Sequence, residues 1–485
     1  MKYNPVQNYI NGQFVNAATS DAMDVVSPVD GSLLSTVPLS GEAELNKAVI
    51  AAKAAFKSWS ATPIKERVQV FFRYKTLIHQ NIDELAKLIV EENGKTYSEA
   101  VAEMEKVIEL TEFACSLPQL VTGELLEVSK GIECRTEYVP LGVVASIVPF
   151  NFPSMVPNWT LPNAIALGNC MIMKPSEKVP LSVGKLAELL KQAGLPDGVL
   201  NIVHGDSKIV EAICDHPDIE AVSFVGSTKV AKLVYRRATY NYKRCVALGG
   251  AKNHLLVLPD AIPGMTAQNI VASMSGCGGQ RCMAASAMVA VGQVNHIVDL
   301  IVIEANKMVA GDNMGAVITK ESKENIERYI TSAEAQGAKV LVDGRNTVIK
   351  GKENGFYVGP TVIDYVTPDM DVAREEIFGP VISIMRANTL DEALAIENDN
   401  PYGNAASVFT QNGGAARHVM NNASAGMIGV NVGVPVPREP FSFGGWNESK
   451  FGVGDITGKS SIEFWTKLKK TTVKWNPEAG VNWMS

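Results

Sequence analysis

Short apolar runs alternate with amphipathic stretches along most of the chain. Four of these runs have the length of buried strands, namely 141–150 (LGVVASIVPF), 170–174 (CMIMK), 199–205 (VLNIVHG) and 221–227 (AVSFVGS). The stretch 181–194 has the apolar spacing of a helix and ends at a glycine. This strand–helix rhythm predicts a parallel sheet with helices on both faces.

Two further parts of the chain differ from this first block. A second α/β block is expected from Asn253, at the run HLLVLPD, to about Gly433. The segments 122–140 and 462–475 contain lysines and alternate polar with apolar residues. We expect both segments to form strands, which pair either in a hairpin or between subunits.

Composition and charge narrow the class of protein. The chain has 485 residues, of which 46% are hydrophobic and 20% charged, so two or three folded domains are expected. The net charge of −7, without a dense basic run, argues against nucleic acid as the main partner. No run of 18 apolar residues and no apolar leader occurs, which predicts a protein that is neither membrane-spanning nor exported.

The seven cysteines are an odd number scattered along the chain, a pattern typical of free thiols in a reducing compartment such as the cytoplasm. Four residues separate Cys277 from Cys282, which fits neither a zinc knuckle nor a redox CxxC pair. We therefore expect no metal site.

Cys282 ends the glycine-rich segment 275–282 (SGCGGQRC). A turn so poor in side chains is expected to leave the thiol accessible, and the charge of Arg281 favours the thiolate. Such a thiolate is a candidate covalent nucleophile. A buried, inert thiol is the equally weighted alternative from this segment alone.

The predicted strands end in residues suited to ligand binding, although neither GxGxxG nor a P-loop is present. Lys174 and Glu177 in KPSE, and Ser227 in FVGST, follow strands of the first block. Asn151 in PFNFP offers an amide donor for an oxyanion, and Glu376 in EEIFGP offers a carboxylate. Each motif by itself also fits an ordinary turn.

Six motifs, PFNFP, KPSE, FVGST, LGGAKN, GGQRC and EEIFGP, occur in the order and spacing of the NAD(P)-dependent aldehyde dehydrogenase superfamily, which the chain resembles over nearly its whole length. The resemblance implies two parallel-sheet α/β domains plus a small β element for oligomerisation. An NAD-binding domain is expected from 1–121 and 142–252, a catalytic domain with the nucleophilic cysteine from 253–440, and oligomerisation strands from 122–141 and 462–485. A homo-oligomer, either a dimer or a tetramer, is implied as well.

The resemblance also implies roles for individual residues. Cys282 is the expected nucleophile, and the Asn151 amide with the Cys282 N–H is the expected oxyanion hole. The residues expected to contact NAD are Val148, Phe150, Lys174, Glu177, Lys178, Ser227, Gly249, Glu376 and Phe378. Glu177 would repel a 2′-phosphate, which favours NAD over NADP.

One departure from the superfamily pattern changes the expected reaction. Members that hydrolyse their thioacyl intermediate carry a glutamate at the position of Ala247, and one residue is inserted here before Lys252. An alanine takes up no proton, so a second thiol, that of coenzyme A, is the expected acyl acceptor. This loss, with the GAKNH and GQRCM runs, is similar to the CoA-acylating methylmalonate-semialdehyde dehydrogenases.

That resemblance implies NAD-dependent oxidation of malonate or methylmalonate semialdehyde, loss of CO2, and transfer of the acyl group to CoA. Arg281 matches the family position for the substrate carboxylate, and Lys106 stands where the family has a second arginine. Lysine keeps the charge but loses the bidentate fork, and a solvated surface charge is an equal alternative for Lys106.

Two other functions remain compatible with the sequence. A hydrolytic aldehyde dehydrogenase would recruit another base, with Glu376 or a water chain as candidates. A non-catalytic relative would be free to lose its nucleophile, yet Cys282, Asn151 and Glu376 are all present.

Overall fold

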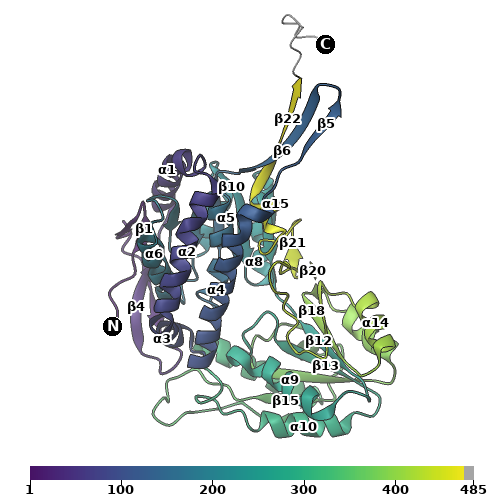
Figure 1. Cartoon of the computed structure of the whole chain (residues 1–485). Helices are drawn as coiled ribbons and strands as arrows, with labels where there is room; N and C mark the ends of the chain where they lie inside the picture. The colour runs from purple at the N-terminus through teal and green to yellow at the C-terminus, as the bar shows by residue number, and fades with distance from the viewer. Residues whose placement is uncertain (475–485) are drawn as a thin grey trace, which may run out of the picture.

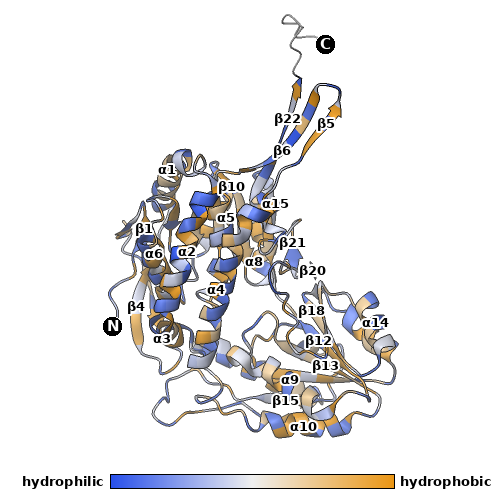
Figure 2. Cartoon of the chain, viewed as in Figure 1, coloured by the Kyte–Doolittle hydropathy of each residue, from blue (hydrophilic) through white to orange (hydrophobic). Residues whose placement is uncertain are grey.

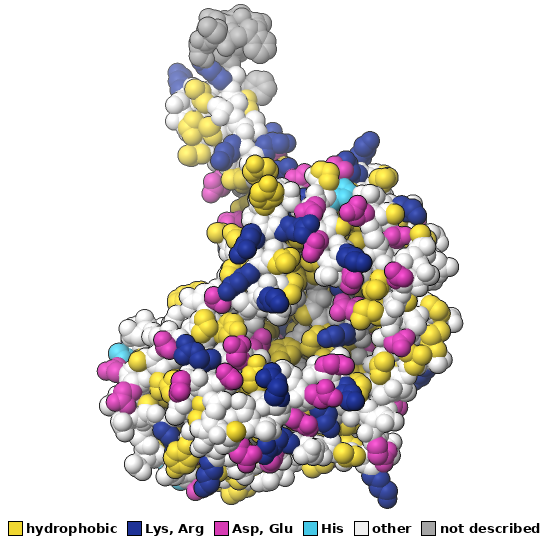
Figure 3. Space-filling view, turned by 180° about the vertical axis from the view of Figure 1, so that it is seen from behind, with side chains coloured by type: hydrophobic (Ala, Val, Ile, Leu, Met, Phe, Trp, Pro, Cys, Tyr) yellow, Lys and Arg dark blue, Asp and Glu magenta, His cyan; other side chains and the backbone are white. Residues whose placement is uncertain are grey.

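A computed structural model of the chain describes residues 1–474. Two open sheets form two lobes, and a narrow three-stranded sheet projects from the first lobe (Figure 1). Viewed from the opposite side, the molecular surface is hollowed between the lobes (Figure 3). The fold is therefore the predicted α/β arrangement with a small additional β element.

The first lobe is built on an eight-stranded sheet. In sheet order its strands are β2 (Gln13–Val15), β1 (Asn8–Ile10), β9 (Leu200–Ile202), β8 (Cys170–Lys174), β7 (Val143–Ile147), β10 (Ile219–Val225), β11 (Arg244–Leu248) and β21 (Lys450–Phe451). The strands from β9 to β11 run parallel, as the strand–helix rhythm predicts. Every residue of β7 and β8 is buried, because helices cover both faces.

Both edges of this sheet depart from the all-parallel prediction. The pairings β1–β2, β1–β9 and β11–β21 are antiparallel. A tight turn connects β1 to β2, and its two residues, Asn11 and Gly12, have φ values of 50° and 74°. Positive φ at both positions is typical of the type I′ turn that asparagine–glycine pairs form in hairpins.

Among residues 1–474, eight helices belong to the first lobe. They are α1 (Glu42–Trp59), α2 (Ile64–Gln80), α3 (Ile82–Asn93), α4 (Tyr97–Leu120), α5 (Met155–Ala166), α6 (Leu181–Gln192), α7 (Ser207–Asp215) and α8 (Thr228–Tyr240). The first four account for most of residues 42–120.

The second lobe is built on a seven-stranded sheet. In sheet order its strands are β14 (Lys339–Val342), β15 (Thr361–Asp364), β16 (Val381–Ala387), β13 (Ala285–Val291), β12 (Asn253–Val257), β18 (Ala405–Phe409) and β19 (Met427–Val430). All neighbouring pairs are parallel except β14–β15.

The helices of the second lobe are α9 (Pro263–Ser275), α10 (Asn295–Ala305), α11 (Lys320–Ala335), α12 (Asp371–Arg374), α13 (Leu390–Asn398) and α14 (Gly413–Asn422), with the 3-10 turn η1 (Gly276–Gly279) after α9. Separate apolar clusters lie on the two faces of this sheet, and a third, larger cluster fills the first lobe. Each lobe therefore has its own core. Within residues 1–474, no helix has the length and apolar content to cross a membrane.

The projecting sheet contains β5 (Leu125–Ser129), β6 (Ile132–Pro140) and β22 (Thr466–Lys474). β22 pairs antiparallel with β6 along its whole length, so the two predicted strand segments meet within one chain. Apolar residues remain on this sheet (Figure 2), and Leu125 and Leu126 are 68% and 66% exposed. The rest of the predicted oligomerisation segment, 475–485, lies outside the described residues.

Two short strand pairs and one short helix complete the described chain. Strands β3 (Ala22–Val26) and β4 (Leu33–Pro38) form a hairpin, β17 (Tyr402–Gly403) pairs with β20 (Trp446–Asn447), and α15 (Ser461–Phe464) leads into β22.

Trp465 joins the projecting sheet to the first lobe. Its side chain is fully buried and lies edge-on to Phe464, with ring centroids 4.6 Å apart. The Trp465 backbone carbonyl accepts a hydrogen bond from Asn169 Nδ2.

We predict that Trp465→Ala destabilises the protein by about 3–5 kcal/mol because it opens a cavity at this junction. The midpoint of urea unfolding measures this loss. Val453→Ala, at a 93% exposed position, is the control, and an equal shift in both variants would contradict the prediction.

Candidate active site

The topology of the first sheet brings four of the motifs to one edge. Strands β8, β7, β10 and β11 are parallel neighbours, so their carboxyl ends lie side by side. Lys174 ends β8, Asn151 follows β7, Ser227 follows β10, and Gly249 follows β11. Ligands of open α/β sheets bind at such an edge.

A cavity of about 220 Å³, here called the strand-end cavity, lies at this edge. Its lining residues are Pro149, Phe150, Asn151, Phe152, Val156, Trp159, Val225, Gly226, Ser227, Gly249, Gly250, Cys282, Glu376 and Phe378. Seven of these residues were proposed from the sequence as catalytic or cofactor-binding. The aromatic and apolar residues of α5 were not proposed, because nothing in the local sequence distinguishes them from core residues.

Four predicted cofactor residues lie beside this cavity without lining it. The Val148 N–H donates to the Lys174 carbonyl, and Lys174 Nζ lies 2.9 Å from Glu177 Oε2. Lys178 Nζ lies 5.1 Å from the centroid of the Phe150 ring, which itself lies edge-on to Phe378.

The ion pair keeps Glu177 charged. Burial acts to raise the pKa of Glu177, but Lys174, a backbone N–H and the charge of Lys178 together hold that pKa below its ordinary value. A charged carboxylate, paired with Lys174, therefore lies at the end of β8.

Glu376 is brought to the cavity from the second lobe. Its Oε1 accepts a hydrogen bond from the Ala251 N–H, 3.0 Å away. The other oxygen lies close to Gly250, where a Cβ would be 2.4 Å from Oε2. Burial raises the pKa of Glu376 to about 7, with that N–H and the charge of Lys252 acting in the opposite direction.

A second cavity, of about 740 Å³, lies along helix α4 and is here called the α4 cavity. Its lining residues are Ser98, Glu99, Ala102, Glu103, Glu105, Lys106, Glu109, Phe152, Met155, Trp159, Cys277, Arg281, Cys282, Met283, Val432, Val434, Val436, Pro437, Arg438, Glu439, Phe443 and Thr457. Many of them recur on α4 at spacings of three or four residues, the repeat of one helix face.

Cys282 lies where the two cavities meet, because it lines both of them together with Phe152 and Trp159. Its carbonyl accepts hydrogen bonds from Asn253 Nδ2 and Asn404 Nδ2, each at 2.8 Å. These two amides belong to the second lobe and fix the backbone of the nucleophile candidate.

The glycine-rich turn before Cys282 has a different role from the one expected. Cys277, Gly278 and Gly279 have φ values of 53°, 61° and 72°, and the turn is buried. A Cβ on Gly279 would lie 2.1 Å from the Gly379 backbone. The glycines therefore permit a left-handed turn packed against the second lobe, and Cys282 is only partly exposed.

Burial acts against the thiolate expected at Cys282. Burial and the charge of Glu376 raise the pKa of Cys282 to about 12, although the N–H groups of Cys282 and Met283 and the charge of Arg281 act to lower it. The guanidinium of Arg281 is directed at Cys277 Sγ and Glu99, each 3.4 Å away. Its effect on Cys282 is therefore weaker than that of burial.

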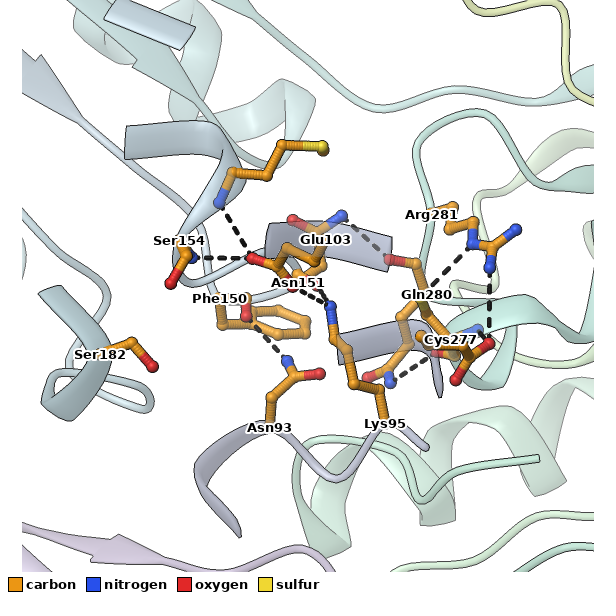
Figure 4. A network of polar contacts seen from close by, with 12 residues as sticks. Asn93, Lys95, Glu103, Phe150, Asn151, Ser154, Ser182, Cys277, Gln280 and Arg281 are labelled. Atoms are coloured by element: carbon orange, nitrogen blue, oxygen red, sulfur yellow. Dashed lines mark hydrogen bonds and ion pairs between the residues drawn. The ribbon is translucent and has the colours of Figure 1, made fainter. Parts of the chain in front are cut away.

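Asn151 is held from two sides. Its side-chain Nδ2 donates a hydrogen bond to the Gln280 carbonyl at 2.9 Å. Its backbone carbonyl accepts a hydrogen bond from Lys95 Nζ, also at 2.9 Å (Figure 4). An amide nitrogen carries two hydrogens, so Gln280 occupies one of them and the second is free for a ligand oxygen.

A buried ion pair that the sequence analysis missed supports Asn151. Lys95 and Glu103 are 2.5 Å apart, and neither side chain is exposed. Glu103 Oε1 accepts from the N–H groups of Ser154 and Met155, where α5 begins, and Lys95 Nζ lies 4.1 Å from the centroid of the Phe152 ring. Figure 4 shows this network converging on Asn151 from α4 and from the segment before it.

A local signal for this network exists in the sequence. Thr96 and Glu99 form a capping box that begins α4. The same Glu99 accepts a hydrogen bond from the Cys277 N–H at 2.6 Å, and Glu103 lies one turn further along the helix. The capping box fixes the register in which α4 directs these carboxylates toward the site.

The two candidate substrate residues, Arg281 and Lys106, both line the α4 cavity with Cys282. Lys106 Nζ lies 2.7 Å from Glu439 and 2.9 Å from Glu109. Arg281 retains 26% side-chain exposure beside Glu99. Both cations therefore already have carboxylate partners.

Ala247, at the position of the missing glutamate, is fully buried within β11 and lines neither cavity. Among the described residues, Glu376 is the only carboxylate that lines the strand-end cavity.

The sequence matches known proteins over almost its whole length. A sequence profile described as the aldehyde dehydrogenase family matches residues 14–471. The chain is 44% identical to malonate-semialdehyde dehydrogenase 2 of Geobacillus kaustophilus, over 97% of this chain and 99% of that protein.

Two solved structures are similar over almost the whole chain. The crystal structure of methylmalonate-semialdehyde dehydrogenase from Oceanimonas doudoroffii has a TM-score of 0.96 at 42% identity and covers 98% of this chain and 99% of its own. That of a protein described as a methylmalonate-semialdehyde dehydrogenase from Sinorhizobium meliloti, in complex with NAD, has a TM-score of 0.97 at 41% identity and covers 99% of each chain.

The protonated state of Cys282 gives a first prediction for this site. Alkylation of Cys282 by iodoacetamide should be slow at pH 7 and rise about tenfold per pH unit toward pH 10, because the thiolate is the reactive form. Glu376→Gln should react several-fold faster above pH 7, where Glu376 is ionised and raises the pKa of Cys282, and at the same rate as the unchanged protein below pH 6. Mass spectrometry of the Cys282 peptide measures both rates, with Cys282→Ala giving the background of the other thiols. Equal rates for the two proteins at pH 8.5 would contradict this assignment.

The buried ion pair gives a second prediction. Glu103→Gln leaves an uncompensated ammonium at Lys95 and should cost about 3–5 kcal/mol of stability while lowering kcat more than it raises KM. The double variant Lys95→Met, Glu103→Leu removes both charges and should recover much of that stability. Its kcat should stay low, because Asn151 and the start of α5 have still lost their anchors. Recovery of kcat together with stability would show that the pair does not position Asn151.

Proposed function

The chain belongs to the aldehyde dehydrogenase family, and we propose that it oxidises malonate or methylmalonate semialdehyde with NAD, releases CO2 and transfers the acyl group to coenzyme A. For malonate semialdehyde the products are acetyl-CoA, CO2 and NADH, so hydrogen and charge balance without water. Relatives that are 42% and 44% identical over almost the whole chain carry the names of semialdehyde dehydrogenases, which supports this substrate class.

One observation carries the proposal: Cys282 lies at the junction of the strand-end cavity and the α4 cavity. A thiol in this place can react with a carbonyl that enters from the α4 side while a cofactor lies on the strand-end side. The large volume of the α4 cavity also leaves space beyond a small semialdehyde for the thiol arm of CoA.

The strand-end residues fit NAD. Ser227 precedes α8, and its side chain is not used to cap that helix, so the hydroxyl and the helix N-terminus are available to a phosphate. The charged Glu177 disfavours a 2′-phosphate, which selects NAD over NADP. NAD, when bound, accepts the hydride of the substrate.

The residues of this chain provide the remaining chemistry. The Cys282 thiol loses its proton to solvent as Sγ attacks the aldehyde carbon, and the resulting oxyanion accepts hydrogen bonds from Asn151 Nδ2 and the Cys282 N–H. Oxidation leaves a thioester on Cys282. Its β-carboxylate departs as CO2, because the same donors stabilise the enolate oxygen that forms, and the enolate carbon then takes up a proton from solvent.

The acyl acceptor is inferred from what the site lacks. Ala247 offers no proton acceptor, so water at the thioester is not activated from β11. A thiol needs less activation than water, and CoA is the acceptor that we propose.

The competing proposal is a hydrolytic aldehyde dehydrogenase that uses Glu376 as its base. The pKa of Glu376 is about 7, which allows this carboxyl group to take up a proton near neutral pH. The hydrogen bond from the Ala251 N–H and the role expected in NAD binding both compete with that use.

We also propose that the protein is a homo-oligomer assembled through the projecting sheet, and that it acts in the cytoplasm. The exposed Leu125, Leu126 and Val128 on β5 support the first proposal. The seven free cysteines support the second.

The dependence on CoA tests the proposed function. With malonate semialdehyde and NAD, removing CoA should slow steady-state NADH formation by about a hundredfold, since general-base activation of water is missing. Mass spectrometry should identify acetyl-CoA when CoA is present, and Cys282→Ala should form no NADH. Equal rates with and without CoA, with a carboxylic acid as product, would instead support the hydrolytic enzyme.

A further inference from the structure

The α4 cavity has three cationic side chains in its lining: Lys106, Arg281 and Arg438. The same lining includes five glutamates, so acidic groups outnumber cationic ones. An anionic substrate is attracted only to a cation whose charge is not already neutralised by a neighbouring carboxylate. Which cation is available therefore determines where a substrate carboxylate binds.

Lys106 is the least available of the three. Glu439 Oε2 and Glu109 Oε2 lie 2.7 and 2.9 Å from its Nζ, and its side chain is 20% exposed. Two carboxylates around one ammonium leave a local excess of negative charge. A substrate carboxylate would have to displace one of them, with no net gain in charge pairing.

Arg281 is partly available. Glu99 lies 3.4 Å from Nη2, a longer contact than either carboxylate makes with Lys106, and Nε is directed at Cys277 Sγ. Glu99 also accepts hydrogen bonds from the Cys277 N–H and from the Thr96 N–H at the start of α4. The negative charge of Glu99 is therefore shared among several donors. Arg281 is adjacent to Cys282 in the chain and is anchored on one side only.

Arg438 is the available cation. Within residues 1–474 its guanidinium has no hydrogen-bond or ion-pair partner, and the side chain is exposed. It lies in a turn closed by the hydrogen bond from the Phe441 N–H to its carbonyl. Glu439, the next residue, is bonded to Lys106 and so holds this turn against α4.

We propose that Arg438, together with Arg281, binds the carboxylate of the semialdehyde, and that the Lys106–Glu439 ion pair positions the turn that presents Arg438. This inference rests on the proposed function and identifies how that function selects an anionic aldehyde. An arginine fork pairs with a carboxylate through two parallel hydrogen bonds, which a lysine does not supply.

The test compares malonate semialdehyde with propanal, which lacks the carboxylate, as the ratio of their kcat/KM values at saturating NAD and CoA. Arg438→Gln should lower this ratio by about tenfold or more, and Arg438→Lys should lower it less. Lys106→Gln should lower it by less than Arg438→Gln does, because Lys106 acts only through the turn that its ion pair with Glu439 holds in place. Arg417→Gln, an exposed arginine on α14 outside both cavities, is the matched control and should leave the ratio unchanged.

Three outcomes would overturn the inference: an unchanged ratio in Arg438→Gln, a larger fall in Lys106→Gln, or an effect of Arg438→Gln confined to the KM for CoA. The last would assign Arg438 to a CoA phosphate. The unsubstituted protein separates this inference from the proposed function. If it has no preference for malonate semialdehyde over propanal, the function is wrong, whereas a preference that persists in Arg438→Gln contradicts only the inference.

Discussion

The buried ion pair between Lys95 and Glu103 is the interaction on which the geometry of the site depends. Removing two charges from water is costly, and the attraction between them offsets this only when further hydrogen bonds satisfy both groups. Those bonds are made to the Asn151 carbonyl and to the first N–H groups of α5. An apolar pair could pack these segments equally well. The charges add direction, because they fix Asn151 in the wall of the cavity that Cys282 also lines.

The nucleophile itself is positioned by both lobes. Glu99 from the first lobe bonds the turn that precedes Cys282, and Asn253 and Asn404 from the second lobe hold its carbonyl. The Asn151 amide joins the two sets, because it donates to the Gln280 carbonyl in that same turn. The site therefore forms only where the lobes meet, and neither lobe contains it alone.

The sequence predicts the parts of this protein that depend on local pattern. Continuous apolar runs such as β7 and β8 are recognisable because both of their faces are buried. The antiparallel edge was missed although Asn11 and Gly12 form the standard hairpin pair, because the flanking strands are only three residues long. The pairing of Lys106 with Glu439 and that of Arg281 with Glu99 were not predicted, because such ion pairs depend on which distant segments meet, and no spacing along the chain records that.

Burial disfavours a resting thiolate at Cys282, and this suits the chemistry of the site. The same low polarity that raises the pKa of Cys282 also raises that of Glu376 and lowers that of Lys252 to about 7, so the site suppresses isolated charge. A resting thiolate would therefore be costly. An oxyanion is less costly, because Asn151 and the Cys282 backbone lie ready to donate to it, and hydrogen bonds to charge are stronger in such surroundings. Negative charge is thus favoured on the substrate oxygen rather than on sulfur, and it develops only when a carbonyl is in place to accept it.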